Sequence, residues 1–257
     1  MKLKILNNKN SELKLDISDT TPVFANSIRR TIITKTNTIA IDTIDLHTNT
    51  SALYNEILAH RIGMIPLKFK DILKRTDECT CNGKGCVNCE VKLVLKKIGP
   101  CTVYSKDLKS TDKNVKPTND KILIVKLLEN QELNLEATAK LGTWSEHAKW
   151  QSSNVGYQYY PDLKTSKDCD MCKLCAKACP KSAIDTTKKI KLKDNYECDL
   201  CGKCVDVCPK KALTLTKDST RIIFTVKSVS GLEPKDIVSG ALKTLKSDLN
   251  ELSKKLK

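Results

Sequence analysis

The feature that most constrains this chain is a cysteine motif that occurs twice between residues 169 and 209. Each copy has three cysteines separated by two residues, then a fourth cysteine followed directly by proline. The first copy contains Cys169, Cys172, Cys175 and Cys179, and the second contains Cys198, Cys201, Cys204 and Cys208. All four positions recur at an offset of 29 residues, as do Ala183 and Ala212, so we interpret the motif as a duplicated unit.

Cysteines with this spacing are typical ligands of iron–sulfur clusters. Three thiolates spaced by two residues bind one cluster, and the fourth, before the proline, reaches the other cluster in two-cluster ferredoxins. The pattern therefore predicts one [4Fe–4S] cluster bound by Cys169, Cys172, Cys175 and Cys208. It predicts a second [4Fe–4S] cluster bound by Cys198, Cys201, Cys204 and Cys179.

Disulfides, zinc and an incomplete pair of clusters are the alternatives for this motif. Disulfides would require an oxidising compartment, and zinc sites use two pairs of cysteines rather than a run of four that ends in proline. One of the two clusters could also be a [3Fe–4S] cluster or be absent. We favour two [4Fe–4S] clusters, in a small domain that cannot account for the rest of the 257 residues.

A second group of cysteines lies earlier in the chain, in a loop of eleven residues. Its members are Cys79, Cys81, Cys86 and Cys89, and Gly83 and Gly85 allow the backbone between them to turn tightly. Four thiolates without an open coordination position are typical of structural zinc. The loop therefore predicts a Zn²⁺ site, although the single residue between the first two cysteines is unusual.

Composition limits the compartment and the partners. Twelve of the 13 cysteines fall in metal-type groups, which indicates a reducing cytosol. The sequence has neither a signal peptide nor an apolar run of about 18 residues, so we expect a cytoplasmic protein without a membrane span. A net charge of +15 indicates acidic partners or simply a lysine-rich surface, and 4% aromatic residues argue against a base-stacking platform.

The periodicity outside the cysteine motifs predicts a mixture of strands and helices. Alternation over 13–17 and 222–226 predicts strands, and apolar runs at 91–95, 122–128 and 133–135 predict more. A helix should begin at Pro22 after the N-cap Thr21, and another should end at Gly63. A long final helix after Pro234 has an apolar stripe made of Ile237, Ala241, Leu245, Leu249, Leu252 and Leu256. Such a stripe can cover the chain's own sheet or bind a second chain.

Four segments together resemble one family. They are Asn26-Ser-Ile-Arg-Arg30, the segment from Asn55 to Leu67 containing Ala-His-Arg-Ile-Gly-Met, Glu146-His-Ala-Lys-Trp150, and the closing strand, Gly-x-x-Pro and helix. In this order they resemble the D-type subunit of archaeal DNA-directed RNA polymerase. That alpha-like family is similar to the third-largest subunit of eukaryotic RNA polymerase II and to the N-terminal domain of the bacterial alpha subunit.

The resemblance implies an α+β fold with three parts. A split alpha-like dimerisation domain would comprise 1–45 and 213–257, a mostly-β inserted domain 46–165 with the cysteine loop 79–89, and a ferredoxin-like iron–sulfur domain 166–212. It also implies a heterodimer with the small alpha-like subunit L, through the final helix and the helix of Phe24, Ile28 and Ile32. The resemblance further implies that this heterodimer binds subunits N and P and the large catalytic subunit, and that the chain meets DNA only indirectly, through the complex.

Two classes of function compete. The first is a non-catalytic assembly subunit of DNA-directed RNA polymerase, a nucleotidyltransferase, with clusters that are structural or regulatory. No catalytic residue is predicted in this chain, because nucleotidyl transfer requires Mg²⁺ held by clustered aspartates and the chain has no Asp-x-Asp-x-Asp. The second is an electron-transfer subunit of an oxidoreductase, which leaves the other 210 or so residues unexplained and lacks a Gly-x-Gly-x-x-Gly motif.

Overall fold

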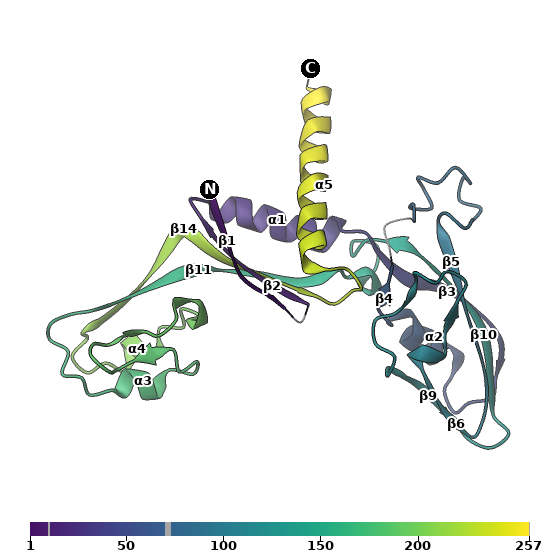
Figure 1. Cartoon of the computed structure of the whole chain (residues 1–257), viewed down its shortest axis with the longest axis horizontal. Helices are drawn as coiled ribbons and strands as arrows, with labels where there is room; N and C mark the ends of the chain where they lie inside the picture. Colours follow the sequence, from purple (N-terminus) through teal and green to yellow (C-terminus); the bar gives the residue numbers. More distant parts are fainter. Residues whose placement is uncertain (10, 70–72, 257) are drawn as a thin grey trace. The chain divides into compact units, whose positions relative to one another are not determined.

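The computed structural model describes residues 1–9, 11–69 and 73–256, and the fold is α+β with sheets dominating (Figure 1). The chain divides into two compact units. Unit 1 comprises Met1–Arg29 and Val155–Val226, and unit 2 comprises Arg30–Asn154 and Lys227–Lys257. No helix among the described residues is long and apolar enough to cross a membrane. Residues 10, 70–72 and 257, which fall within the predicted domain ranges, lie outside the described residues.

Unit 1 is built on a four-stranded sheet in the order β1-β2-β14-β11. Its strands are β1 (Lys2–Lys9), β2 (Glu12–Ser18), β14 (Leu213–Ser228) and β11 (Ser153–Thr165). The first two strands pair antiparallel, and the alternating segment 13–17 lies within β2, which confirms the predicted strand. Leu13, Leu15 and Ile17 are buried on β2, and Phe224 is buried on β14. The period-2 pattern therefore locates the apolar side of this sheet correctly.

The duplicated cysteine motif lies between β11 and β14, which are neighbours in this sheet (Figure 1). The amide of Ser166 donates to the carbonyl of Ala212 at 2.8 Å, so the region begins and ends at one point. Its elements are α3 (Leu174–Ala178), β12 (Ile184–Asp185), β13 (Lys191–Leu192), η3 (Asn195–Glu197) and α4 (Lys203–Asp206). A small apolar cluster joins Cys175 and Cys204 to Ile184, Ile190 and Leu213. With so little apolar surface, this region needs a further source of stability.

Unit 2 contains a sheet in the order β3-β10-β5-β7 and two small sheets, β4-β8 and β6-β9. The strands of the larger sheet are β3 (Thr38–Asn49), β10 (Glu132–Gly142), β5 (Glu90–Ile98) and β7 (Lys109–Ser110). The pairs are β4 (Leu67–Lys68) with β8 (Lys116–Pro117), and β6 (Cys101–Tyr104) with β9 (Leu123–Leu127). The one-turn helix η1 (Ser105–Asp107) follows β6.

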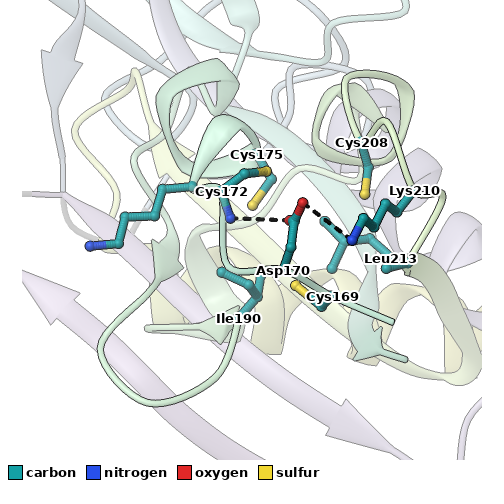
Figure 2. A pocket seen from close by; sticks show the side chains of 10 residues that line it. Cys169, Asp170, Cys172, Cys175, Ile190, Cys208, Lys210 and Leu213 are labelled. Carbon is teal, nitrogen blue, oxygen red and sulfur yellow. Dashed lines mark hydrogen bonds and ion pairs between the residues drawn. The ribbon is translucent and has the colours of Figure 1, made fainter. Parts of the chain in front are cut away.

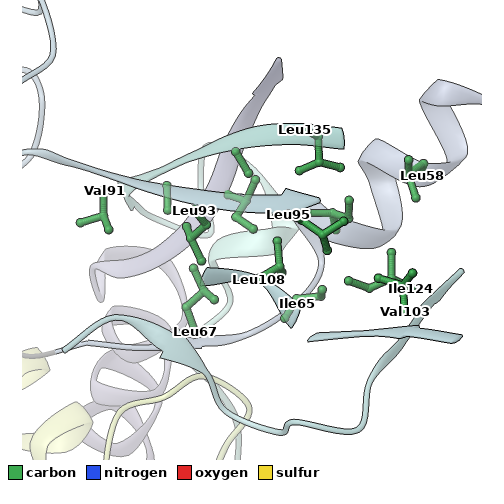
Figure 3. Packing of buried hydrophobic residues seen from close by; sticks show 14 of the residues in the cluster. Leu58, Ile65, Leu67, Val91, Leu93, Leu95, Val103, Leu108, Ile124 and Leu135 are labelled. Carbon is green, nitrogen blue, oxygen red and sulfur yellow. The ribbon is translucent and has the colours of Figure 1, made fainter. Parts of the chain in front are cut away.

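The apolar core of unit 2 lies between these sheets and α2 (Asn55–Gly63) (Figure 3). Leu58 and Ile62 of α2 are completely buried, while Ile57 is half exposed, so only part of the predicted helical stripe faces the core. β5, β9 and β10 confirm the strands predicted from apolar runs, and β10 is much longer than its predicted part. Burial of some twenty apolar side chains supplies the main stabilisation of this unit.

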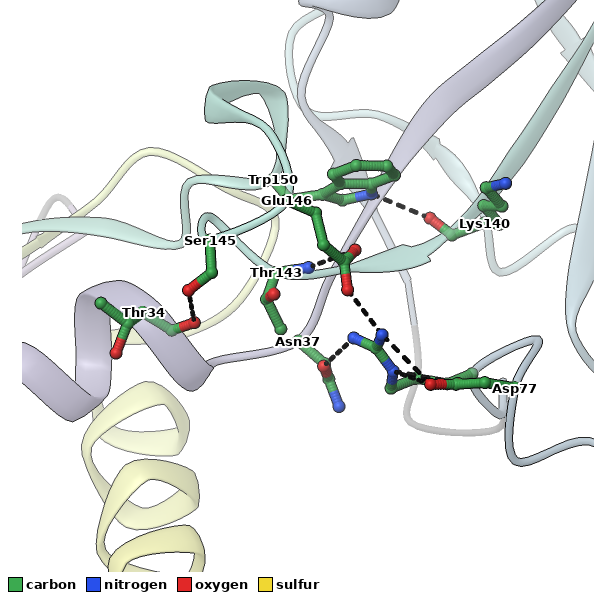
Figure 4. Close-up of polar contacts among 9 residues, drawn as sticks. Thr34, Asn37, Asp77, Lys140, Thr143, Ser145, Glu146 and Trp150 are labelled. Atoms are coloured by element: carbon green, nitrogen blue, oxygen red, sulfur yellow. Dashed lines mark hydrogen bonds and ion pairs between the residues drawn. The ribbon is translucent and has the colours of Figure 1, made fainter.

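The loop after β10 packs one of its two tryptophans into the fold (Figure 4). Trp150, in η2 (Ala148–Trp150), is 6% exposed and donates from Nε1 to the carbonyl of Lys140 at 3.1 Å, whereas Trp144 is 41% exposed. Glu146 accepts from Arg75 at 2.5 Å, and hydrogen bonding to that guanidinium lowers the pKa of the Glu146 carboxyl. In this loop Trp150 packs into the fold, and the polar contact of Glu146 with Arg75 lies beside it.

The two long helices begin where the sequence predicts. α1 (Pro22–Lys35) starts at Pro22, and the Thr21 hydroxyl accepts from the amide of Phe24 at 3.3 Å. α5 (Pro234–Lys255) starts at Pro234. Ile28 and Ile32 of α1, expected at a partner surface, are instead buried within the chain. A helical stripe does not reveal whether the chain's own fold covers it, and a role for the rest of α1, with the partly buried Phe24, at the partner surface stays a prediction.

Candidate metal centres

Four thiols from both copies of the motif line one pocket of unit 1 (Figure 2). They belong to Cys169, Cys172, Cys175 and Cys208. Ile190 and Leu213 also line the pocket, so part of its wall is apolar. The set contains three cysteines of the first copy and the last cysteine of the second, which is the combination expected for one cluster of a two-cluster ferredoxin.

A polar contact connects the two copies at the rim of this pocket (Figure 2). Lys210, two residues after Cys208, lies 3.6 Å from the carboxylate of Asp170. That carboxylate also accepts from the backbone amide of Cys172 at 3.3 Å. The amide of Cys172 is the largest cause that lowers the pKa of Asp170. Asp170 therefore joins the loop of Cys172 in the first copy to the segment that carries Cys208.

The backbone repeats along with the sequence. Met171 and Lys173 have φ of 59° and 63°, and Leu200 and Gly202, which follow them by 29 residues, have φ of 61° and 78°. These left-handed residues turn the chain between successive cysteines, so three thiols can face one point. Only Gly202 adopts this conformation without cost, because a side chain in the left-handed region costs about 1 kcal/mol per residue. The local fold of both copies thus contains strain that a bound group can offset.

The pKa of Cys204 is affected by burial and by the other three cysteines of the second predicted quartet. Burial is the largest cause that raises the pKa of the Cys204 thiol, and the neighbouring Cys198, Cys179 and Cys201 raise it further. Burial likewise raises the pKa of Cys175, with smaller contributions from Cys172 and Cys169. Each buried thiol therefore has its neighbours within its own quartet. A bound iron atom would supply the positive charge that keeps such a thiolate ionised, so the donor sets fit an iron–sulfur cluster.

The cysteine loop of unit 2 gathers its four sulfur atoms within 4.8 Å of one another. Cys79 and Cys86 are 3.5 Å apart, Cys81 and Cys89 are 3.6 Å apart, and Cys86 and Cys89 are 3.7 Å apart. Four sulfurs at 2.3 Å from one tetrahedral zinc would be separated by about 3.8 Å. The loop is therefore close to the size of a single-ion tetrathiolate site.

The backbone of the loop also prepares these thiols for a cation. The amide of Cys86 donates to the sulfur of Cys89 at 3.2 Å. A backbone hydrogen bond from Cys81 is the largest cause that lowers the pKa of Cys79 to about 7, while burial raises that of Cys89 to about 12. Burial and the closeness of the other thiols oppose ionisation of all four together when no cation is bound. A divalent ion would favour the thiolate form of all four.

Several side chains near the first copy could not be found from the sequence. Ile190 and Leu213 are apolar residues without any motif, and each comes to the cysteines through the tertiary fold. The pair of Asp170 and Lys210 spans 40 residues, so no local pattern identifies it. Cys101, the thirteenth cysteine, lies outside all three groups and packs half-buried against the core of unit 2, as expected for a small apolar side chain.

Two family models match separate parts of the chain. The RNA polymerase Rpb3/RpoA insert domain matches residues 39–158. The 4Fe-4S dicluster domain matches residues 162–209, which span both copies of the cysteine motif. The chain therefore combines an alpha-like polymerase insert domain with a ferredoxin-like iron–sulfur domain.

Curated relatives match nearly the whole length. DNA-directed RNA polymerase subunit Rpo3 of Archaeoglobus fulgidus is 36% identical over 255 residues, covering 98% of this chain and 96% of the relative. Rpo3 of Methanothermobacter thermautotrophicus is 36% identical over 258 residues, covering 98% and 97%. Rpo3 of Picrophilus torridus is 34% identical over 270 residues, covering 99% of both. The chain belongs to the Rpo3 family of archaeal DNA-directed RNA polymerase subunits.

Proposed function

We propose that this chain is a non-catalytic, alpha-like assembly subunit of a cytoplasmic DNA-directed RNA polymerase. It would form a heterodimer with the small alpha-like subunit of the L type. The heterodimer would then bind subunits N and P and the large catalytic subunit, which holds the Mg²⁺ chemistry and brings DNA into the complex. The observation that carries this proposal is similarity along nearly the whole chain to Rpo3 subunits of known polymerases.

The distribution of apolar side chains on α5 supports a partner there. Ile237 and Ala241, in the first half of the helix, are buried within the chain. Leu242, Leu249 and Leu252 of the helix and its C-cap Leu256 are exposed. Leucines repeated at helical spacing and exposed to water indicate a helix that packs against a second chain. We assign that position to the small alpha-like subunit.

Copurification tests the proposal against its alternative. A tagged copy of the full chain, expressed in its own host, should retain the small alpha-like subunit and the large polymerase subunits, identified by mass spectrometry. The alternative, an electron-transfer subunit of an oxidoreductase, predicts a flavin- or nicotinamide-dependent enzyme instead. Recovery of such an enzyme without polymerase subunits would contradict the assembly function.

For the iron–sulfur domain we propose two [4Fe–4S] clusters with structural or regulatory roles. One would be bound by Cys169, Cys172, Cys175 and Cys208, and the other by Cys198, Cys201, Cys204 and Cys179. Anaerobic purification should give about eight iron atoms per chain. A value near four, or one reduced by a [3Fe–4S] cluster, would restrict the proposal to a single intact cluster.

For the loop 79–89 we propose a structural Zn²⁺ bound by Cys79, Cys81, Cys86 and Cys89. Substituting serine for Cys86 should reduce zinc from about one per chain to below a tenth of that, because a hydroxyl replaces one of four thiolates. Iron should not change, since the iron sites lie in the other unit. Metal analysis of Cys86→Ser beside Cys101→Ser, a control outside every thiol group, measures both effects. A wild-type chain without zinc would contradict the site.

The domain division also stays a proposal: dimerisation domain 1–45 with 213–257, inserted domain 46–165, and iron–sulfur domain 166–212. Each domain would have one task in the assembly. The first would bind the small subunit, the second would contribute the zinc loop, and the third would respond to cluster loading.

A further inference from the structure

A buried carboxylate on β2 forms the centre of an ion-pair network in unit 1. Asp16 is 5% exposed, although it lies between apolar residues of a strand. Its two oxygens accept from Nε and Nη2 of Arg221 on β14, at 3.0 and 2.6 Å. Burial of a charge is costly unless it is paired and hydrogen-bonded. The two-pronged contact with the guanidinium meets that requirement.

A third donor to this carboxylate comes from the iron–sulfur domain. The hydroxyl of Tyr196 donates to Oδ2 of Asp16 at 2.9 Å, and Nη2 of Arg221 donates to the same hydroxyl at 3.3 Å. Lys14, two residues before Asp16 on β2, donates from Nζ to the carbonyl of Tyr196 at 2.9 Å. Tyr196 lies in η3, two residues before Cys198. Strand β2 therefore contacts both the side chain and the backbone directly before the second copy of the motif.

Aromatic packing reinforces these hydrogen bonds. The guanidinium carbon of Arg221 lies 3.6 Å from the ring centre of Tyr160 on β11. Tyr160 and Tyr196 meet edge to face, with ring centres 5.8 Å apart and planes at 74°. Two more hydrogen bonds connect the same segment to β11. The side chain of Asn195 donates to the carbonyl of Pro161 at 3.1 Å, and the side chain of Gln158 donates to the carbonyl of Cys198 at 3.4 Å. Residues 195–198 are thus bound to three strands of the sheet.

The first copy of the motif is held differently. Among the described residues, Asp168 pairs with Ser166, and Asp170 pairs with Lys210 and the amide of Cys172. These contacts all lie between 166 and 210, within the iron–sulfur domain itself. The side-chain hydrogen bonds named for the loop before Cys198 therefore reach the sheet, whereas those named for the loop of Cys169 and Cys172 stay between 166 and 210. The sheet touches the first copy through apolar packing, with Leu213 of β14 lining its pocket.

We propose that Asp16 and Tyr196 are positioning residues for the second iron–sulfur cluster, which the sheet of unit 1 thereby holds more firmly than its own loop could. This proposal rests on the ligand sets proposed above. Neither residue belongs to the proposed ligand sets, and each acts through the backbone that leads to Cys198. Retention of the second cluster, and not of the first, should then depend on a hydrogen bond to β2.

Removing the hydroxyl of Tyr196 isolates this contact. Tyr196→Phe keeps the ring that packs against Tyr160, while Asp16 keeps both bonds from Arg221. A hydrogen bond to a charged group contributes enough to slow release by roughly tenfold. Tyr160→Phe is the matched control, because it also removes one tyrosine hydroxyl and keeps the ring stacked on Arg221.

The test uses the full chain, loaded anaerobically and then treated with an iron chelator. In Tyr196→Phe, half of the iron and sulfide should be released about tenfold faster than in the wild type, while the other half is released at the wild-type rate. Hydrogen exchange should increase across 194–204 and stay unchanged across 167–176. Tyr160→Phe should match the wild type in both measurements.

Two results would overturn the proposal. One is equal release from Tyr196→Phe and Tyr160→Phe, and the other is faster release of all the iron in Tyr196→Phe. A wild-type chain that binds no iron would instead overturn the cluster assignment itself, so the two failures are distinguishable. Unchanged thermal unfolding of the iron-free variants would verify that the sheet of unit 1 remains folded.

Discussion

Leu249→Glu is expected to abolish co-elution of this chain with the small alpha-like subunit. The Leu249 side chain is 59% exposed on α5, so the chain's own fold does not depend on it. In a heterodimer it would be buried, and a carboxylate at that position would lose its hydration without gaining a partner. Loss of an apolar anchor at the centre of an interface weakens binding by about 30-fold or more, and a buried charge adds to that loss.

A substitution on another face of the same helix provides the control. Ser247 is exposed and lies two residues before Leu249, which is more than half a turn around α5. Ser247→Glu adds the same charge and should leave co-elution unchanged. Size-exclusion chromatography of the coexpressed pair measures both variants, with iron per chain as a check of folding. Dimer formation by Leu249→Glu at wild-type strength would contradict the assignment of α5 to this interface.

The second large effect concerns the first cluster. Replacing Cys169, Cys172 and Cys175 with serine should remove at least half of the iron and increase hydrogen exchange across 166–211. The reason is that this region has only a small apolar cluster, so its folding free energy should come largely from metal–thiolate bonds. Binding of the small alpha-like subunit should persist, while later assembly with the large subunits weakens.

The expected damage is confined because the sheet of unit 1 and the core of unit 2 have their own buried residues. Cys101→Ser is the control for loss of a thiol, because Cys101 belongs to none of the three groups. Hydrogen exchange read by mass spectrometry measures the loss of protection across 166–211, and a pull-down measures whether the small subunit still binds. If cluster loss released the small subunit, or left 166–211 fully protected, a structural and local role would be ruled out.

The sequence predicted features that depend on local spacing. The helix starts at Pro22 and Pro234 and the strands around 91–95 and 222–226 follow from patterns of a few residues, and the duplicated motif follows from one repeat at an offset of 29 residues. The sequence did not predict which part of an apolar stripe is buried by the chain's own fold. In α5, Ile237 is buried and Leu249 is exposed, although both belong to one apolar stripe.

Contacts between distant residues were beyond the sequence for the same reason. In the alternating segment 13–17, Asp16 has the position of a solvent-facing residue, yet it is buried against Arg221, which lies 205 residues later. The two tryptophans near residue 150 differ in burial: Trp150, which donates to the carbonyl of Lys140, is buried, whereas Trp144 is exposed. Tertiary pairing decides such cases, and one sequence contains no record of it.

The hydrogen bond between Ser166 and Ala212 joins the two points where the peptide leaves and re-enters the sheet. The two ends of the iron–sulfur region therefore lie as close together as the two ends of a hairpin turn. Its removal would leave β11 and β14 as neighbours that a short turn can connect. Evolution can therefore add, degrade or discard this region without redesigning the sheet, and a protein engineer could exchange it for another domain whose termini lie equally close.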